Sequence, residues 1–288
     1  MRKQFDTSRR DMMKLAVGAG GVAAGLAAAG GSMREAHAQL LDSGVDSNSV
    51  LARIKKENKL RVGYSQTVPW FQKSAKTGGL IGIYHDVAEK LAKALEVEAE
   101  YHEVSWANAT VALRKGDFDV FGSSLFYTMP RALVVNYVGP MWHKGRLAVV
   151  HKDNAGRFKS AADFDNPDVT FSVNIGSSEE NWVKTTFPKA KIITTSGNIT
   201  LAAEPVRAKK ADIWATGDLD AVLFARKNSR WAHVVNEKTP IGMTANTWAI
   251  RYGDDAWKYF LDMWADHMVT SGYMKERYDH YLGELSKG

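Results

Sequence analysis

The chain has 288 residues, a formal net charge of +6, 24% charged residues and no cysteine. The lack of cysteine excludes disulfides, thiolate metal ligands and a cysteine nucleophile. No run of lysine and arginine exceeds two residues and none alternates with aromatic residues, so the positive charge does not indicate nucleic-acid binding.

Residues 1–38 have the pattern of an export signal. A basic start contains the twin arginine Arg9-Arg10, a mildly apolar run follows over 15–31, and Ala36-His37-Ala38 is a small-x-small cleavage site. The apolar run is weaker than the roughly 20 strongly apolar residues that span a bilayer, so a retained anchor is disfavoured. We expect a Tat-type signal peptide over 1–38 and a mature protein in the periplasm.

From Leu60 onward, short β-rich segments alternate with amphipathic helical segments. The predicted strands are 60–64, 98–104, 118–122, 146–151, 169–173, 191–194, 211–215, 233–236 and 247–251. The predicted helices are 84–96, 108–115, 178–187, 199–210, 218–227 and 254–270, with a last helix after Gly272. This alternation is typical of an α/β chain with mostly parallel sheets.

Two segments, 137–145 and 238–246, contain glycine and proline and predict extended connectors between two halves of the chain. Because the chain would pass to the second half and return, the first lobe is expected to consist of two separate segments. We expect lobe one to comprise 40–143 plus 247–288, and lobe two to comprise 144–246.

The segment 116–131 (GDFDVFGSSLFYTMPR) leads a strand into two adjacent hydroxyls, Ser123 and Ser124, and then to Arg131. A guanidinium presents a planar fork that can pair with a carboxylate through two hydrogen bonds. Taken alone, the segment favours a simpler interpretation, a strand followed by a turn and a solvated surface arginine.

Several segments together resemble bacterial extracellular solute-binding proteins of family 3, the periplasmic amino-acid receptors of ABC transporters. They are 60–63 (LRVG), 82–92 (GIYHDVAEKLA), 113–119 (LRKGDFD), 128–131 (TMPR), 137–140 (YVGP), 176–178 (GSS), 211–212 (AD) and 271–273 (SGY). The resemblance covers essentially the whole mature chain. It implies the type II periplasmic binding protein fold, with two lobes of mostly parallel sheet flanked by helices and two hinge crossings.

The resemblance also implies the function. It indicates a monomer without cofactor that closes on an amino acid or a related small carboxylate and delivers it to the inner-membrane permease of an ABC transporter. The family's ligand carboxylate is held by an arginine, which the resemblance places at Arg131, with Ser123 and Ser124 as neighbouring donors. Ser177 and Ser178 would contact the ligand from the opposite lobe, where the start of a helix favours an anion. Either serine is also a plausible simple N-cap.

The resemblance places aromatic residues around the ligand side chain. Trp106 falls where one such ring is expected, whereas the other position falls at Val68, with Trp70 two residues later. Phe126 replaces a hydroxyl that is usual near the pocket, which predicts a more apolar side-chain site.

An acidic residue of the family meets the ligand α-ammonium just after the strand that contains Asp212. Here Gly217 holds that place, Asp218 comes one residue later and Asp220 lies beyond it. Asp218 is therefore the candidate, although it also suits a helix N-cap. Loss of the contact would indicate a ligand without the amine.

An enzyme on the same scaffold is the alternative, because some relatives of the family are cyclohexadienyl (arogenate/prephenate) dehydratases. Such an enzyme needs a general acid, for which Glu179 and Lys144 are the candidates. The eight histidines show no metal-binding spacing. We expect a binding protein with no metal and no catalytic activity.

Overall fold

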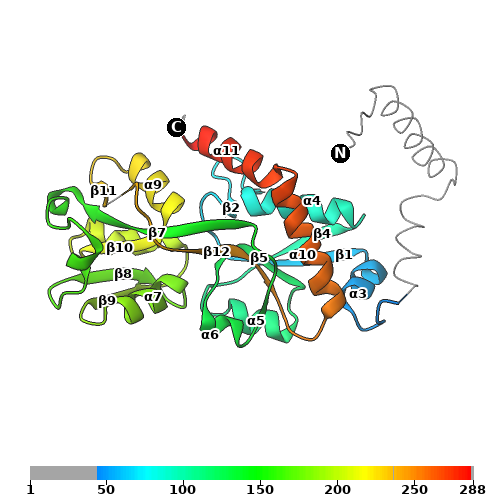
Figure 1. Cartoon of the computed structure of the whole chain (residues 1–288). Coiled ribbons are helices and arrows are strands. Elements are labelled where there is room, and N and C mark those ends of the chain that lie inside the picture. The colour runs from blue at the N-terminus through cyan, green and yellow to red at the C-terminus, as the bar shows by residue number, and fades with distance from the viewer. Residues whose placement is uncertain (1–43, 236, 287–288) are drawn as a thin grey trace, which may run out of the picture. The chain divides into compact units, whose positions relative to one another are not determined.

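The computed structural model describes residues 44–235 and 237–286, and the elements below belong to the unit Asp46–Gly288 (Figure 1). The predicted signal peptide lies outside the described residues. No helix in these two ranges is long and apolar enough to cross a membrane. The helices are α3 (Val50–Glu57), α4 (Ile83–Ala94), α5 (Ala109–Lys115), α6 (Met129–Ala132), α7 (Ser178–Thr186), α8 (Glu204–Arg207), α9 (Asp218–Lys227), α10 (Asp255–Thr270) and α11 (Tyr273–Ser286). The strands are β1 (Lys59–Tyr64), β2 (Gln72–Lys73), β3 (Leu80–Ile81), β4 (Glu98–Glu103), β5 (Val120–Phe126), β6 (Asn136–Tyr137), β7 (Trp142–His151), β8 (Thr170–Asn174), β9 (Lys191–Thr195), β10 (Ile213–Gly217), β11 (Ala232–Val235) and β12 (Ile241–Ile250).

The main sheet runs in the order β4-β1-β5-β12-β7-β10-β8-β9, with β6 and β11 paired to β12 and β7. Parallel pairing joins β4, β1 and β5 at one end and β10, β8 and β9 at the other. The long strands β7 and β12 pair antiparallel with each other and with these two groups. Figure 1 shows helices gathered around each group, with β7 and β12 running between them. The fold is therefore α/β with two lobes joined by two strands.

The two crossings differ from the predicted connectors because they are hydrogen-bonded strands. His143 pairs with Ala245 and Lys144 with Thr244, and the register shifts between Ile241 and Thr244. Pairing satisfies the backbone groups of both crossings, which an unpaired connector would leave to water.

The predicted helix over 199–210 is also interrupted. A 3₁₀ helix covers Ile199–Ala203 and α8 begins at Glu204. Pro205 lies in the first turn of α8 and has no N–H to continue the preceding helix.

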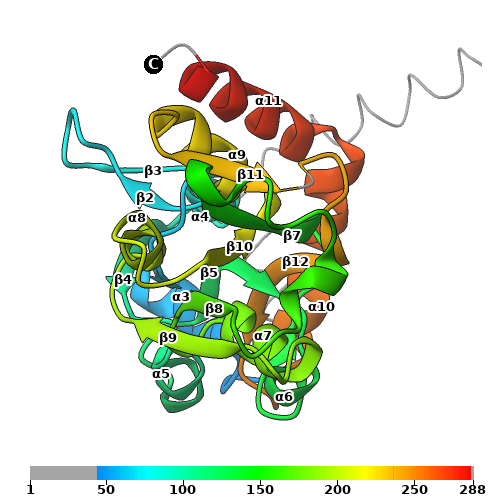
Figure 2. The same cartoon turned by 90° about the vertical axis from the view of Figure 1, so that its left-hand side faces the viewer.

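The core of the second lobe follows from the alternation of strand side chains. Ala148 and Val150 belong to one apolar cluster with Val183 of α7, whereas the intervening Val149 belongs to another with Ala221 of α9. Successive side chains on a strand point to opposite faces, so β7 contributes to both clusters. Figures 1 and 2 accordingly show α7 and α9 on opposite sides of these strands.

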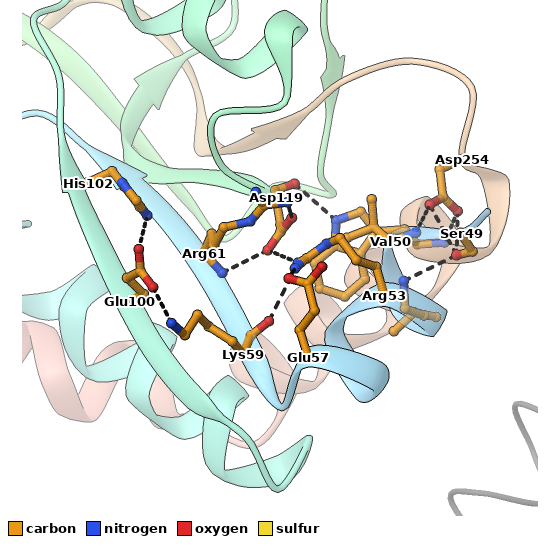
Figure 3. Close-up of polar contacts among 12 residues, drawn as sticks. Ser49, Val50, Arg53, Glu57, Lys59, Arg61, Glu100, His102, Asp119 and Asp254 are labelled. Atoms are coloured by element: carbon orange, nitrogen blue, oxygen red, sulfur yellow. Dashed lines mark hydrogen bonds and ion pairs between the residues drawn. The ribbon is translucent and has the colours of Figure 1, made fainter. Parts of the chain in front are cut away.

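Two carboxylates, buried Asp119 and half-buried Asp254, connect the N-terminal part of the described chain to the first lobe (Figure 3). Asp254 accepts hydrogen bonds from the Ser49 hydroxyl at 3.0 Å and the Val50 N–H at 2.6 Å. Asp119 accepts the Arg61 N–H at 2.7 Å and forms ion pairs with the side chains of Arg61 and Arg53. These contacts connect α3 to β1, β5 and the start of α10, and so support the base of β5.

Candidate functional site

A narrow pocket lies where the end of β5, the beginning of β7 and the first turns of α7 and α9 meet. Both lobes contribute to it. Its lining residues are Thr67, Trp106, Ser124, Phe126, Lys144, Ser178, Glu179, Ile199 and Asp220. Because charged, hydroxyl and aromatic side chains converge on one cleft between lobes, this is the candidate ligand site.

Arg131 reaches from the first lobe to the second beside this pocket. Its Nη2 donates to the Gly176 carbonyl at 3.0 Å, and its guanidinium lies 5.9 Å from the centre of the Trp106 ring. Its Nη1 is buried and has no hydrogen-bond partner in residues 44–235 and 237–286. Burial lowers the pKa of Arg131, while Tyr137 and Glu179 act in the opposite direction. The half-buried guanidinium therefore offers one buried, unused donor, Nη1.

Lys144 and Asp220 form an ion pair inside the pocket. The lysine Nζ lies 2.8 Å from Asp220 Oδ2 and 3.3 Å from the Ser124 hydroxyl. Both charged residues are buried, with 1% of Lys144 and 6% of Asp220 exposed. Burial raises the pKa of Asp220 to about 6, against the attraction of Lys144. The pair connects the hinge strand β7 with α9 of the second lobe.

A second buried pair joins Arg146 of β7 to Glu179 of α7, with 3.8 Å between Nε and Oε1. The Arg146 guanidinium lies 4.2 Å from the centre of the Phe126 ring, and burial lowers the pKa of Arg146. The Ser178 hydroxyl donates to Glu179 at 3.1 Å. The two pocket carboxylates, Asp220 and Glu179, are thus each paired with a basic residue of β7.

The structure brings together four of the residues predicted for the site, since Ser124, Phe126, Trp106 and Ser178 line the pocket. Trp70 is buried beside it, with the Lys144 ammonium 4.6 Å above its ring.

The other two predicted serines make structural contacts. Ser123 is fully buried and donates to the Ser65 carbonyl at 2.8 Å. Ser177 is the N-cap of α7, and its hydroxyl accepts the Glu180 N–H. Neither is among the pocket-lining residues.

The two candidate aspartates at the start of α9 have different environments. Asp218 accepts the Gly145 N–H at 2.9 Å and the Leu219 N–H at 2.7 Å, and does not line the pocket. Asp220 lines it. Residues two positions apart on a helix point about 200° apart around its axis, so only one of the two can face the cleft.

The sequence does not predict Arg146, Thr67 and Ile199 for the site, and it indicates Lys144 and Glu179 only as candidate acids of the alternative enzyme. One signal was available for β7. Lys144 and Arg146 are two residues apart, so they share a face of β7, and the other residues from Gly145 to Val150 are apolar and buried. Fully buried lysine and arginine are rare unless paired. Within the described ranges, no group of three potential metal ligands occurs.

A two-lobed α/β fold with a polar cleft at its two crossing strands defines a ligand-binding protein of the type II periplasmic class. The model of the bacterial extracellular solute-binding proteins, family 3, matches residues 60–284, and the chain belongs to this family. The fold and the family expected from the sequence are therefore confirmed.

Three relatives illustrate the range of the family. A cyclohexadienyl dehydratase of Pseudomonas aeruginosa is 26% identical over 81% of this chain and 86% of the relative. The crystal structure of AncCDT-1, an ancestral amino acid-binding protein and precursor of cyclohexadienyl dehydratase, has 31% identity and a TM-score of 0.74, covering 81% of this chain and 99% of that one. A lysine-complexed binding component of an ABC transporter from Wolinella succinogenes has 28% identity and a TM-score of 0.71, covering 77% and 95%.

Proposed function

We propose that the protein is a periplasmic solute-binding protein that captures an amino acid or a related small carboxylate and delivers it to an ABC transporter permease. The observation that carries this proposal is Arg131, a half-buried cation of the first lobe whose buried Nη1 is an unused donor beside the pocket. A carboxylate is the ligand group that pairs best with a guanidinium, through charge-assisted hydrogen bonds. The binding relatives support the class of ligand.

The proposed mechanism is closure of two lobes, 40–143 plus 247–288 and 144–246, about the crossing strands. The ligand binds the first lobe through Arg131, Ser124 and Trp106, and groups around Ser178 complete its surroundings from the second. A ligand that contacts both lobes has higher affinity for the closed form and shifts the population toward it. The permease would recognise that closed form. No bond is made or broken.

Calorimetry with the purified protein tests this function against a panel of amino acids, 2-oxo acids and aromatic acids. A specific ligand raises the melting temperature by mass action. It also closes the lobes, and the ligand concentration at which small-angle X-ray scattering shows closure should agree with the dissociation constant from calorimetry. We expect a carboxylate to do both. Failure of every carboxylate in the panel would contradict the proposed function.

A second candidate function is a dehydratase on this scaffold, favoured by one observation beyond the 26% identical relative. Asp220 is a buried pocket carboxyl whose pKa is raised to about 6, and a general acid works best with a pKa near the operating pH. Incubation with prephenate and arogenate tests it. Turnover that is lost in the Asp220→Asn and Glu179→Gln variants would establish the enzyme, whereas no turnover by folded protein would exclude it.

A further inference from the structure

We propose that Lys144 acts as a built-in ammonium group that fills the cationic part of the cleft, so that the ligand is a carboxylic acid without an ammonium group. This inference rests on the proposed binding function and narrows its ligand class. It would favour 2-oxo, hydroxy or simple carboxylic acids over the corresponding amino acids.

The surroundings of Lys144 are those that a protein offers to a bound ammonium ion. The Nζ lies 2.8 Å from the Asp220 carboxylate and 3.3 Å from the Ser124 hydroxyl. The rings of Trp70 and Phe126 lie 4.6 Å and 5.2 Å from it. A carboxylate, a hydroxyl and aromatic faces stabilise a desolvated cation. Because the lysine already occupies this arrangement, a ligand ammonium has no equivalent place.

The pocket charges lead to the same conclusion. Asp220 is paired with Lys144, and Glu179 is paired with Arg146 at 3.8 Å. Arg131, in contrast, makes no ion pair in the described part of the chain. A ligand carboxylate would supply the missing negative charge. The one buried pocket carboxylate oxygen without a hydrogen-bond partner in the described residues is Asp220 Oδ1. A ligand ammonium there would share a single carboxylate with the buried Lys144 ammonium, and repulsion between the two cations costs free energy.

Matched pairs of acids test the inference on the wild-type protein. Calorimetry would compare phenylpyruvate and 3-phenylpropionate with L-phenylalanine, 4-methyl-2-oxopentanoate with L-leucine, and 2-oxoglutarate with L-glutamate. We expect the acid without the amine to bind at least tenfold more tightly in every pair that binds. Equal or tighter binding of the amino acid would overturn this inference and leave the proposed function standing. Absence of binding in all pairs would contradict the proposed function, and this inference with it.

Removal of the built-in ammonium gives a second test. Lys144→Met keeps the aliphatic length and vacates the place beside Asp220, so we expect the amino acid of the preferred pair to gain at least tenfold in affinity. The K144M/D220N double variant lacks the carboxylate and should not show this gain. Lys152→Met, in an exposed position beyond the end of β7, is the matched control and should bind as wild type does.

K144M leaves Asp220 buried without its partner, which lowers stability. The double variant removes both charges and so leaves neither of them buried without a partner. The comparison of acids with amino acids on the wild-type protein depends on no variant. A folded K144M protein, shown by circular dichroism, that still rejects the amino acid would overturn the role given to Lys144.

Discussion

The Arg131 guanidinium donates a hydrogen bond to the Gly176 carbonyl, which lies in the turn between β8 and α7 of the other lobe. The same guanidinium keeps Nη1 unpaired. One side chain can therefore hold the lobes together through one nitrogen and meet a ligand through the other. In this arrangement, ligand binding and closure depend on the same group.

Replacement of Arg131 by alanine should weaken carboxylate binding by about 2–5 kcal/mol, because a desolvated charge pair loses one partner. Arg131→Lys keeps the charge but not the planar fork, so it should recover only part of the affinity. Calorimetry measures both. Arg114→Ala, at an exposed position in the last turn of α5, is the control. Unchanged affinity in R131A would show that the carboxylate binds elsewhere.

Gly176 allows the two lobes to approach each other closely. It has φ +74°, and a Cβ placed there would lie 2.4 Å from the Ala107 Cα. Ala107 adjoins Trp106 in the first lobe, so Gly176→Ala should keep the cleft from closing fully. We expect at least tenfold weaker binding and a larger radius of gyration with saturating ligand, measured by small-angle X-ray scattering.

Gly156→Ala is the matched glycine control, because a Cβ at Gly156 meets no atom within 4 Å. If G176A binds and closes as G156A does, the contact with Ala107 does not limit closure.

The sequence predicted those features of the fold that depend on local periodicity. Apolar residues at helical spacing placed α4 within two residues of its observed bounds, and the burial of Val87 and Leu91 follows that pattern. The pairing of β7 with β12 could not be found in this way. It joins residues about 100 positions apart, such as His143 and Ala245, and strand pairing over that distance leaves no periodic signal in either segment.

The candidate site was predictable to the extent that its residues follow one another along the chain. Ser124 and Phe126 lie two residues apart on β5, so their side chains share one face of the strand and both line the pocket. Which of two neighbouring side chains faces the ligand depends on the exact start of an element. Ser123 and Ser124 differ in this way, since one bonds the Ser65 carbonyl and the other lines the pocket.

Asp218 and Asp220, in the first turn of α9, allow a test of which neighbouring side chain faces the ligand. Asp218→Ala removes the acceptor of the Gly145 N–H, so we expect a loss of about 1–3 kcal/mol in the free energy of unfolding, with ligand selectivity unchanged. Urea unfolding gives the first quantity and calorimetry with the matched acids gives the second. A change in ligand selectivity with unchanged stability would place Asp218, rather than Asp220, at the ligand.

The pH dependence of stability tests the environment of Asp220. Its pKa is raised to about 6 because burial, helped by repulsion from Asp218 and Glu179, outweighs the attraction of Lys144. An unfolded aspartate has a pKa of about 3.9. For a carboxyl with a raised pKa in the folded state, the contribution to stability is present below about pH 4 and is lost as the pH rises through about 6.

Wild-type stability should therefore fall relative to Asp220→Asn between pH 4 and pH 7, because asparagine does not titrate. The shift of roughly two pKa units corresponds to a change on the order of 3 kcal/mol. Urea unfolding of both proteins at intervals across this range measures the difference, and titrations common to both proteins cancel in it. A difference that instead favours the wild type as the pH rises would mean that the attraction of Lys144 outweighs burial and that the pKa of Asp220 is lowered.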